Sequence, residues 1–269
     1  MRTPSPMGDD HWPRHARQWA LVGPPLRPSL EDVALAETAV SSVAGGRALV
    51  LGVTPELVGM RWPATTTHVL AVERARAVIS SIHAAQHTAT AIHGDWLALP
   101  CANASLAAIV GDGSLSNLRF PDQYRALAAE LARVRAPGGV IALRLFAAPE
   151  RRESLAAVAD DLRGGRVGNI NVLKWRLAMA VQPDERNVAV VDILRAFDEV
   201  VPDRAALSQQ LGWSRAHLDS VDVYRGSALT YSFPTVAEVC ESLAPRLARR
   251  TVQTPGYELG DRCPTLVLG

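Results

Sequence analysis

The sequence predicts an α/β protein built on a doubly wound, mostly parallel sheet, with a helical insertion and a closing antiparallel hairpin. Two observations carry this prediction. Short apolar runs, as expected for strands buried on both faces, alternate with helical patterns over residues 31–149. Residues 150–225 then interrupt this rhythm with helical patterns alone, before the alternation resumes over residues 226–269.

Residues 1–30 are expected to form an irregular arm ahead of this core. Prolines prevent long regular structure there, and they stand at Pro13, Pro24, Pro25 and Pro28. Ser29 has the features of a helix N-cap, because acidic side chains follow it within one turn. We therefore expect a helix from residue 30 to about Val43, ended by the Gly45-Gly46 pair.

The core elements follow in order. Five strands are expected at Arg47–Val53, Thr67–Val72, Thr88–His93, Leu106–Val110 and Val140–Phe146. Helices are expected after the Thr54-Pro55-Glu56 turn, at Ala75–Ala85 and at Pro121–Val134, and Pro137-Gly138-Gly139 is expected to turn the chain into the fifth strand.

The second half of the chain is expected to begin with helices that cover the ligand-binding edge of the sheet. These insertion helices are predicted at Glu153–Leu162, Val172–Val181, Val188–Phe197 and Arg204–Leu211. The resumed core is predicted to contain a strand at Ser227–Phe233, a helix at Thr235–Leu247, and an antiparallel pair formed by Thr251–Leu259 and Thr265–Leu268.

Composition narrows the class of protein. The chain has 269 residues, enough for one large domain, and a net charge of +1, which provides no general field for a polyanion. Three widely spaced cysteines form no metal-binding or disulfide pattern, and no apolar run is long enough to span a membrane. We expect a cytoplasmic protein that binds no metal, nucleic acid or membrane, and whose oligomeric state is open.

Candidate ligand-binding residues follow four successive strands, where a doubly wound sheet binds its ligands. Gly52 follows the first strand and permits close backbone approach. Glu73 ends the second strand, where a carboxylate can accept hydrogen bonds from ribose hydroxyls. Asp95 and Trp96 follow the third strand, and the Gly111-Asp112-Gly113 stretch follows the fourth.

These motifs make the sequence resemble the class I S-adenosylmethionine-dependent methyltransferases over residues 47–147. The more specific parts are the Gly94-Asp95-Trp96 stretch followed by Leu99-Pro100, and the Leu131–Val134 helix end followed by Pro137-Gly138-Gly139. The resemblance implies a seven-stranded Rossmann-like sheet, S-adenosylmethionine as cofactor, ribose binding by Glu73 and adenine binding by Asp95 and Trp96. The full implied cofactor set is Arg27, Gly52, Val53, Thr54, Glu56, Glu73, Arg74, Asp95, Trp96, Gly111, Asp112 and Gly113.

The first turn departs from the family pattern of an acidic residue followed by three alternating glycines. Gly52 is the one glycine that remains, because Val50 replaces the acid, and Thr54 and Glu56 replace the later glycines. Thr54 and Glu56 could bind the ligand's ammonium group directly; alternatively, the site has decayed and binds nothing. A carboxylate at this turn would repel a pyrophosphate, so the sequence disfavours a nicotinamide enzyme, which stays a distant alternative.

The lead hypothesis is methylation of an O, N or C atom of a small molecule, with an aromatic or heterocyclic acceptor suggested by the aromatic residues of the insertion. The alternatives are an RNA or protein methyltransferase, and a non-catalytic binder of S-adenosylmethionine. Methyl transfer requires alignment above all, with a base where the nucleophile is protonated. The candidates for that base are His11, Asp112, Tyr224 and Tyr231, and Arg27 is a candidate partner for the cofactor carboxylate.

Overall fold

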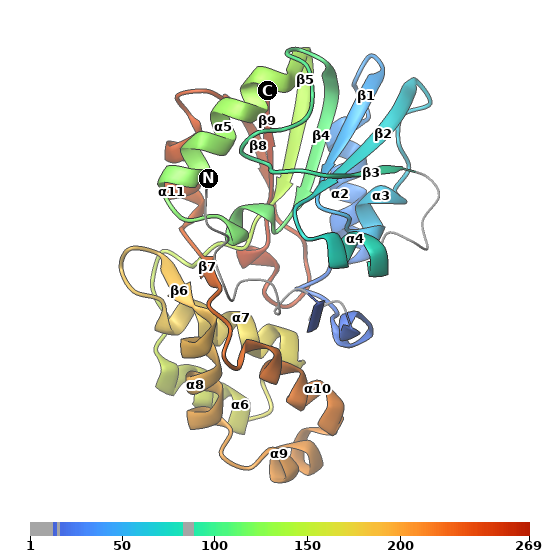
Figure 1. The fold of residues 1–269 in the computed structure, drawn as a ribbon. Helices are drawn as coiled ribbons and strands as arrows, with labels where there is room; N and C mark the ends of the chain where they lie inside the picture. The colour runs from blue at the N-terminus through green and yellow to red at the C-terminus, as the bar shows by residue number, and fades with distance from the viewer. Residues whose placement is uncertain (1–12, 15–16, 83–88) are drawn as a thin grey trace, which may run out of the picture.

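The computed structural model describes residues 13–14, 17–82 and 89–269. Within them, seven strands form the main sheet in the order β3-β2-β1-β4-β5-β9-β8 (Figure 1). Strand β9 runs antiparallel to both of its neighbours, so β8 is parallel to β1–β5. The strands are β1 Gly46–Leu51, β2 Thr66–Glu73, β3 Thr90–His93, β4 Leu106–Asp112, β5 Arg135–Arg144, β8 Arg249–Gln253 and β9 Thr265–Leu268. The predicted doubly wound sheet is confirmed.

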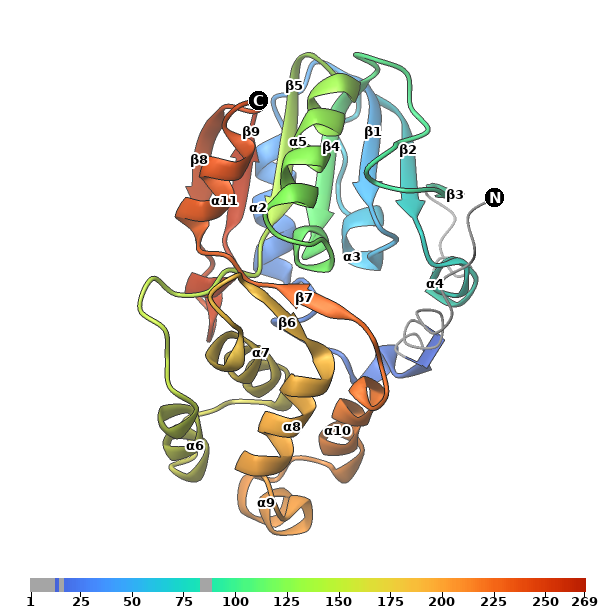
Figure 2. The same ribbon diagram turned by 60° about the vertical axis from the view of Figure 1, so that its left-hand side comes forward.

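Helices cover both faces of this sheet (Figures 1 and 2). One face packs against α2 (Leu30–Val40), α3 (Pro55–Val58) and α4 (Arg76–Ile82). The other face packs against α5 (Asp122–Val134) and α11 (Val236–Leu243). Strand β1 is apolar on both faces, as expected for a strand covered by helices on each side. Ala48 and Val50 pack on the side of α2, α3 and α4, and Leu49 and Leu51 pack on the side of α5 and α11.

Two capping boxes begin helices of the sheet layers. At α2 the Ser29 hydroxyl accepts from the Asp32 amide while the Asp32 carboxylate accepts from the Ser29 amide, which confirms the predicted N-cap. Thr235 and Glu238 make the same exchange at α11. Both helices end earlier than expected, at Val40 and Leu243.

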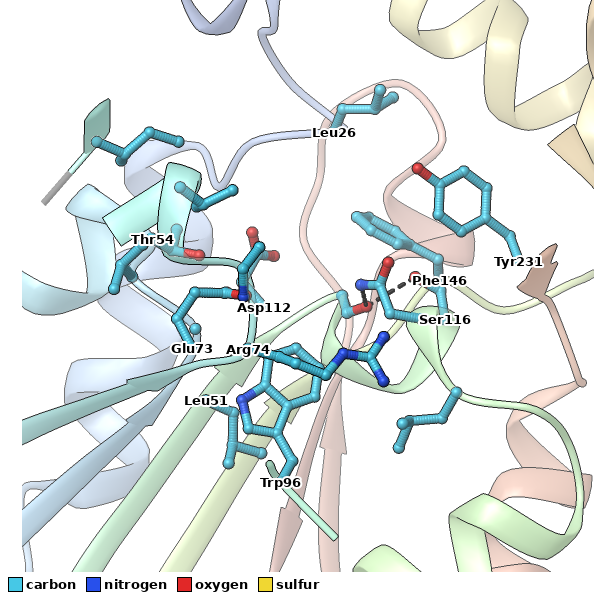
Figure 3. A pocket seen from close by; sticks show the side chains of 18 of the residues that line it. Leu26, Leu51, Thr54, Glu73, Arg74, Trp96, Asp112, Ser116, Phe146 and Tyr231 are labelled. Atoms are coloured by element: carbon cyan, nitrogen blue, oxygen red, sulfur yellow. Dashed lines mark hydrogen bonds between the residues drawn. The ribbon is translucent and has the colours of Figure 1, made fainter. Parts of the chain in front are cut away.

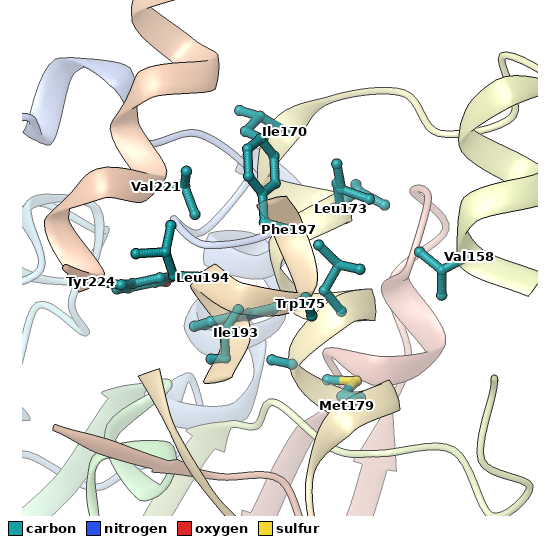
Figure 4. Close-up of a cluster of buried hydrophobic side chains, with 14 of the residues drawn as sticks. Val158, Ile170, Leu173, Trp175, Met179, Ile193, Leu194, Phe197, Val221 and Tyr224 are labelled. Atoms are coloured by element: carbon teal, nitrogen blue, oxygen red, sulfur yellow. The ribbon is translucent and has the colours of Figure 1, made fainter. Parts of the chain in front are cut away.

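The insertion is a second layer packed below the carboxyl ends of the strands (Figures 1 and 2). Its own apolar core joins α6, α7, α8 and the short turn η4 (Figure 4). The elements are α6 Leu155–Arg163, α7 Ile170–Val181, β6 Asn187–Ala189, α8 Val190–Val200, α9 Arg204–Leu211, α10 Arg215–Asp219, η4 Ser220–Tyr224 and β7 Thr230–Ser232. The predicted helical character of this region is confirmed.

Three details differ from the expectation. The strand expected at Ser227–Phe233 is the three-residue β7, which pairs with β6 in a separate two-stranded sheet instead of the main one. The expected turn at Pro137-Gly138-Gly139 lies inside β5, which begins at Arg135 and pairs irregularly with β4 there. The partner of β9 is β8, which ends at Gln253, so the chain between them is longer than a tight hairpin.

Candidate functional site

A cavity of about 1160 Å³, including open solvent at its mouth, lies between the carboxyl edge of the sheet, the arm and the insertion (Figure 3). The turns after β1, β2, β3 and β4 form one side of it. Glu73, Thr54 and Asp112 lie on that side, and Phe146 and Tyr231 lie across from them (Figure 3). The arm contributes the remaining wall through Trp19, Val22 and Leu26.

The turn after β1 leaves the cavity open because Gly52 has no side chain. Its φ is +104°, a conformation that favours glycine, and its amide donates to the Val72 carbonyl at 2.8 Å. A Cβ atom at Gly52 would lie 3.8 Å from Glu73 Oε2 and 3.8 Å from Trp96 Cζ2, so it would project between two cavity-lining side chains. Thr54 precedes α3 as its N-cap residue, and its hydroxyl makes no capping hydrogen bond.

Polar groups after β2 and β3 are held in place by the backbone. Glu73 Oε1 accepts from the Ala75 amide at 2.7 Å, and burial raises the pKa of this carboxyl above its usual range. The Trp96 indole N–H donates to the Val72 carbonyl at 2.6 Å, and Asp95 Oδ1 accepts from the Leu97 amide at 3.0 Å. The strand ends therefore present two carboxylates beside a fixed indole ring.

Asp112, at the end of β4, belongs to a buried charge network. Arg144 Nη1 donates to Asp112 Oδ1 at 2.5 Å, and Arg144 Nε lies 3.0 Å from Asp32 Oδ1. The Tyr257 hydroxyl accepts from Arg144 Nη2 at 2.9 Å and donates to Asp32 Oδ1 at 2.9 Å. The pKa of Asp112 is raised to about 6, because burial and the nearby charges of Asp32 and Glu56 outweigh the opposing effect of Arg144.

The wall opposite the strand ends is aromatic. Trp175 of α7 makes edge contacts with Phe146, Tyr231 and Phe233, with ring centroids 5.1, 5.5 and 5.1 Å apart, and Tyr224 lies 6.3 Å from Tyr231. Trp175 is both a core residue of the insertion and a wall of the cavity. Burial raises the pKa of the Tyr224 and Tyr231 phenols far above neutrality.

Most of the predicted site residues meet at this one cavity. Those that line it are Gly52, Val53, Thr54, Glu73, Arg74, Asp95, Trp96, Asp112, Gly113, Tyr224 and Tyr231. His11 lies outside the described residues.

Arg27, Glu56 and Gly111 are the exceptions among the described candidates, since none of them lines the cavity. Arg27 Nε donates to Glu56 Oε1 at 2.8 Å, so the two side chains neutralise each other. The expected contacts of these two side chains with charged groups of the ligand stay predictions. Gly111 lies within β4, where a Cβ atom would lie 2.8 Å from Ser114 Oγ, so packing explains this glycine without a ligand.

Sequence reasoning missed Arg144, Tyr257 and Phe146. A charged side chain inside the apolar run Val140–Phe146 was the available signal for Arg144, because a buried arginine requires acidic partners. Nothing local in the sequence marks Tyr257 or Phe146.

Two further features concern metals and membranes. Among the described residues, no three His, Cys, Asp or Glu side chains are placed to hold a metal ion. No helix in the described part of the chain combines the length and apolar character needed to cross a bilayer.

Comparisons with known proteins support the fold. No family model matches the sequence, and no curated protein matches it. A structure from Rhodobacter sphaeroides, provisionally named a zinc-dependent alcohol dehydrogenase, is 10% identical, with a TM-score of 0.64 and 97% of each chain covered. The DhpI-SAM-HEP complex is 16% identical, with a TM-score of 0.54 and coverage of 99% of this chain and 100% of that one.

The N-methyltransferase NodS from Bradyrhizobium japonicum, in complex with S-adenosylhomocysteine, is 11% identical. Its TM-score is 0.50, and the match covers 97% of this chain and 98% of that one. At these identities the likeness concerns the fold alone. Together with the strand order, it shows that the chain has the Rossmann-like fold of class I methyltransferases.

Proposed function

We propose that this cavity binds S-adenosylmethionine and that the protein transfers its methyl group to a small molecule. One observation carries the proposal: four successive strand ends bring Gly52, Glu73, Asp95 and Asp112 to a single cavity on a fold shared with methyltransferases. S-adenosylmethionine supplies an activated methyl group on a cationic sulfonium.

The order of the strands gives the cofactor a direction along the edge. Leu51 of β1 pairs with Val72 of β2 on one side and with Gly111 of β4 on the other. Glu73 and Asp112 therefore flank the Gly52 turn. Glu73 is suited to accept from the ribose hydroxyls, with the adenine beside Asp95 and Trp96, and the amino-acid tail then extends over Gly52 toward Asp112.

The carboxylates at the carboxyl edge of the sheet suit the positively charged groups of S-adenosylmethionine. Three carboxylates, those of Glu73, Asp95 and Asp112, line the cavity, where they would disfavour a pyrophosphate but favour a sulfonium and an ammonium group. Arg74 is the cationic side chain among the described lining residues. A dinucleotide-dependent oxidoreductase, which must bind a pyrophosphate, fits this edge poorly.

The acceptor is assigned to the aromatic side of the cavity. Phe146, Trp175, Tyr224 and Tyr231 offer flat, largely apolar surfaces on that side. Burial raises the pKa of both phenols, so they are protonated at neutral pH, and the Tyr231 hydroxyl can donate a hydrogen bond to an acceptor. We infer an uncharged aromatic or heterocyclic acceptor enclosed by the arm and the insertion.

Calorimetric titration tests the cofactor assignment. S-adenosylmethionine and S-adenosylhomocysteine should bind in the micromolar range, and Glu73→Gln and Asp95→Ala should each weaken binding about tenfold or more. Glu241→Gln changes an exposed glutamate away from the cavity and is the matched control. Absence of binding by the parent protein, or binding unaffected by both site variants, would contradict the proposal.

Turnover then separates an enzyme from a non-catalytic binder. Formation of S-adenosylhomocysteine is measured with a panel of phenols and nitrogen heterocycles, and with RNA and protein extracts as alternative acceptors. Turnover confined to small acceptors supports the proposal, whereas turnover with RNA or protein alone would favour a macromolecular substrate. Tight binding without turnover of any acceptor would favour a binding protein.

A further inference from the structure

The Arg144 side chain connects four segments that lie far apart in the sequence. Its guanidinium contacts Asp112 at the end of β4 and Asp32 in the first turn of α2. It also donates to the Pro25 carbonyl of the arm at 2.5 Å and to the Tyr257 hydroxyl at 2.9 Å. The side chain is only 4% exposed, and it does not line the cavity.

The charges around Arg144 do not balance within the protein. Two carboxylates, those of Asp32 and Asp112, share one guanidinium, and their side chains are 1% and 6% exposed. A buried carboxylate is unfavourable unless a cation, hydrogen bonds or protonation compensates its charge, and Asp32 already accepts from the Ser29 amide and the Tyr257 hydroxyl. Of the two carboxylates, Asp112 is the one that faces the cavity, so a ligand cation can reach it.

We infer that Arg144 is a positioning residue, which holds the Asp112 carboxylate in place and ionised at the cavity edge, where Asp112 receives the ammonium group of the cofactor's amino-acid tail. This inference rests on the proposed function. Arg144 acts through Asp112 and touches no ligand itself, whereas its bond to Pro25 fixes the arm over the same end of the cavity.

The groups that face Asp112 determine its response to pH. Arg144 on β5 favours the carboxylate, whereas burial and the charges of Asp32 on α2 and Glu56 on α3 favour the protonated form, and the pKa of Asp112 is raised to about 6. Tail binding should therefore weaken as the pH falls through about 6, because protonation removes the charge that meets the ammonium. Weakening the ion pair between Arg144 and Asp112 should raise the pKa of Asp112 and so move this loss of affinity to higher pH.

A truncated ligand separates this effect from general damage to the site. The test compares S-adenosylhomocysteine with 5′-methylthioadenosine, which keeps the adenosine but lacks the amino-acid tail, by calorimetry between about pH 5 and pH 7. The ratio of the two affinities isolates the tail, because Glu73 and Asp95 serve both ligands equally. In the parent protein this ratio should fall as the pH drops through about 6.

Arg144→Lys keeps the positive charge but loses the planar fork that reaches Asp112, Asp32 and Pro25 together. We expect it to weaken S-adenosylhomocysteine binding about tenfold at pH 7, to leave 5′-methylthioadenosine within about twofold, and to shift the pH profile upward. Tyr257→Phe, which removes one hydroxyl from the network, should give a smaller shift in the same direction. Arg151→Lys, at an exposed position, controls for the substitution type.

Equal weakening of both ligands with an unchanged pH profile would assign Arg144 a structural role only and overturn the inference. An unchanged profile with unchanged affinities would overturn it as well. If the parent protein binds 5′-methylthioadenosine and S-adenosylhomocysteine equally, the cofactor site stands but Asp112 does not hold the tail. If it binds neither ligand, the proposed function itself fails, and this inference with it.

Discussion

Replacement of Lys174 by methionine should stabilise the protein at neutral pH. Lys174 lies in the insertion core, is 4% exposed, and donates one hydrogen bond of 2.7 Å to Ser220 Oγ. Burial lowers its pKa from 10.5 to about 8. Since one pKa unit corresponds to about 1.4 kcal/mol, the buried charge costs about 3 kcal/mol at pH 7 relative to an uncharged amine.

The sign of the pH dependence follows from proton counting. Between about pH 8 and pH 10.5 the unfolded lysine keeps a proton that the folded one has lost, so the parent gains stability as the pH rises. Methionine has a similar length and no charge, although the Ser220 hydroxyl loses its donor, which costs about 1 kcal/mol. We expect Lys174→Met to raise the free energy of unfolding by about 2 kcal/mol at pH 7.

Urea denaturation of both proteins at pH 7 and pH 10 measures this difference. The advantage of the variant should shrink at pH 10 or change sign, because the parent amine is then mostly neutral. Ser220→Ala removes the hydrogen-bond partner without changing the lysine. It also removes the bond that Ser220 Oγ donates to the His217 carbonyl, so it gives an upper limit on the contribution of the Lys174 bond. A variant less stable than the parent at pH 7, with the same difference at pH 10, would show that the buried charge of Lys174 does not destabilise the protein.

Three further changes test other parts of the structure. Gly52→Ala should lower stability by about 1–3 kcal/mol because of its φ of +104°, and should weaken S-adenosylhomocysteine at least tenfold; calorimetry showing unchanged affinity would contradict this. Thr235→Ala removes the cap of α11 and should cost about 1 kcal/mol in urea denaturation without changing ligand affinity. Tyr231→Phe should keep cofactor affinity but raise KM for an acceptor that is methylated. An unchanged KM would show that the Tyr231 hydroxyl does not contribute to acceptor binding.

The sheet could be predicted because each strand carries its own evidence in sequence. Buried strands such as β1 and β4 are continuous apolar runs, and parallel strands place their carboxyl ends on one edge without any knowledge of the contacts. That rule was sufficient to predict that Glu73, Asp95 and Asp112 lie close together, and all three line the cavity.

What the sequence could not show were interactions between distant residues. Arg144 meets Asp112, Pro25 and Tyr257 across 32, 119 and 113 positions of the chain, and no local pattern records such partners. Arg27 and Glu56 were predicted to contact the ligand, but their mutual pairing across 29 positions was not predicted. Strand β7 has three residues, too few for periodicity to reveal which strand it pairs with.

A crystal structure of the protein with S-adenosylhomocysteine is the sharpest test of the proposed cofactor site. We expect density along the carboxyl edge, with the ribose hydroxyls within hydrogen-bond distance of Glu73, the adenine beside Asp95 and Trp96, and the tail over Gly52 toward Asp112. Density for the ligand elsewhere on the molecule, or in this cavity with the adenine against the aromatic wall of the insertion, would contradict it.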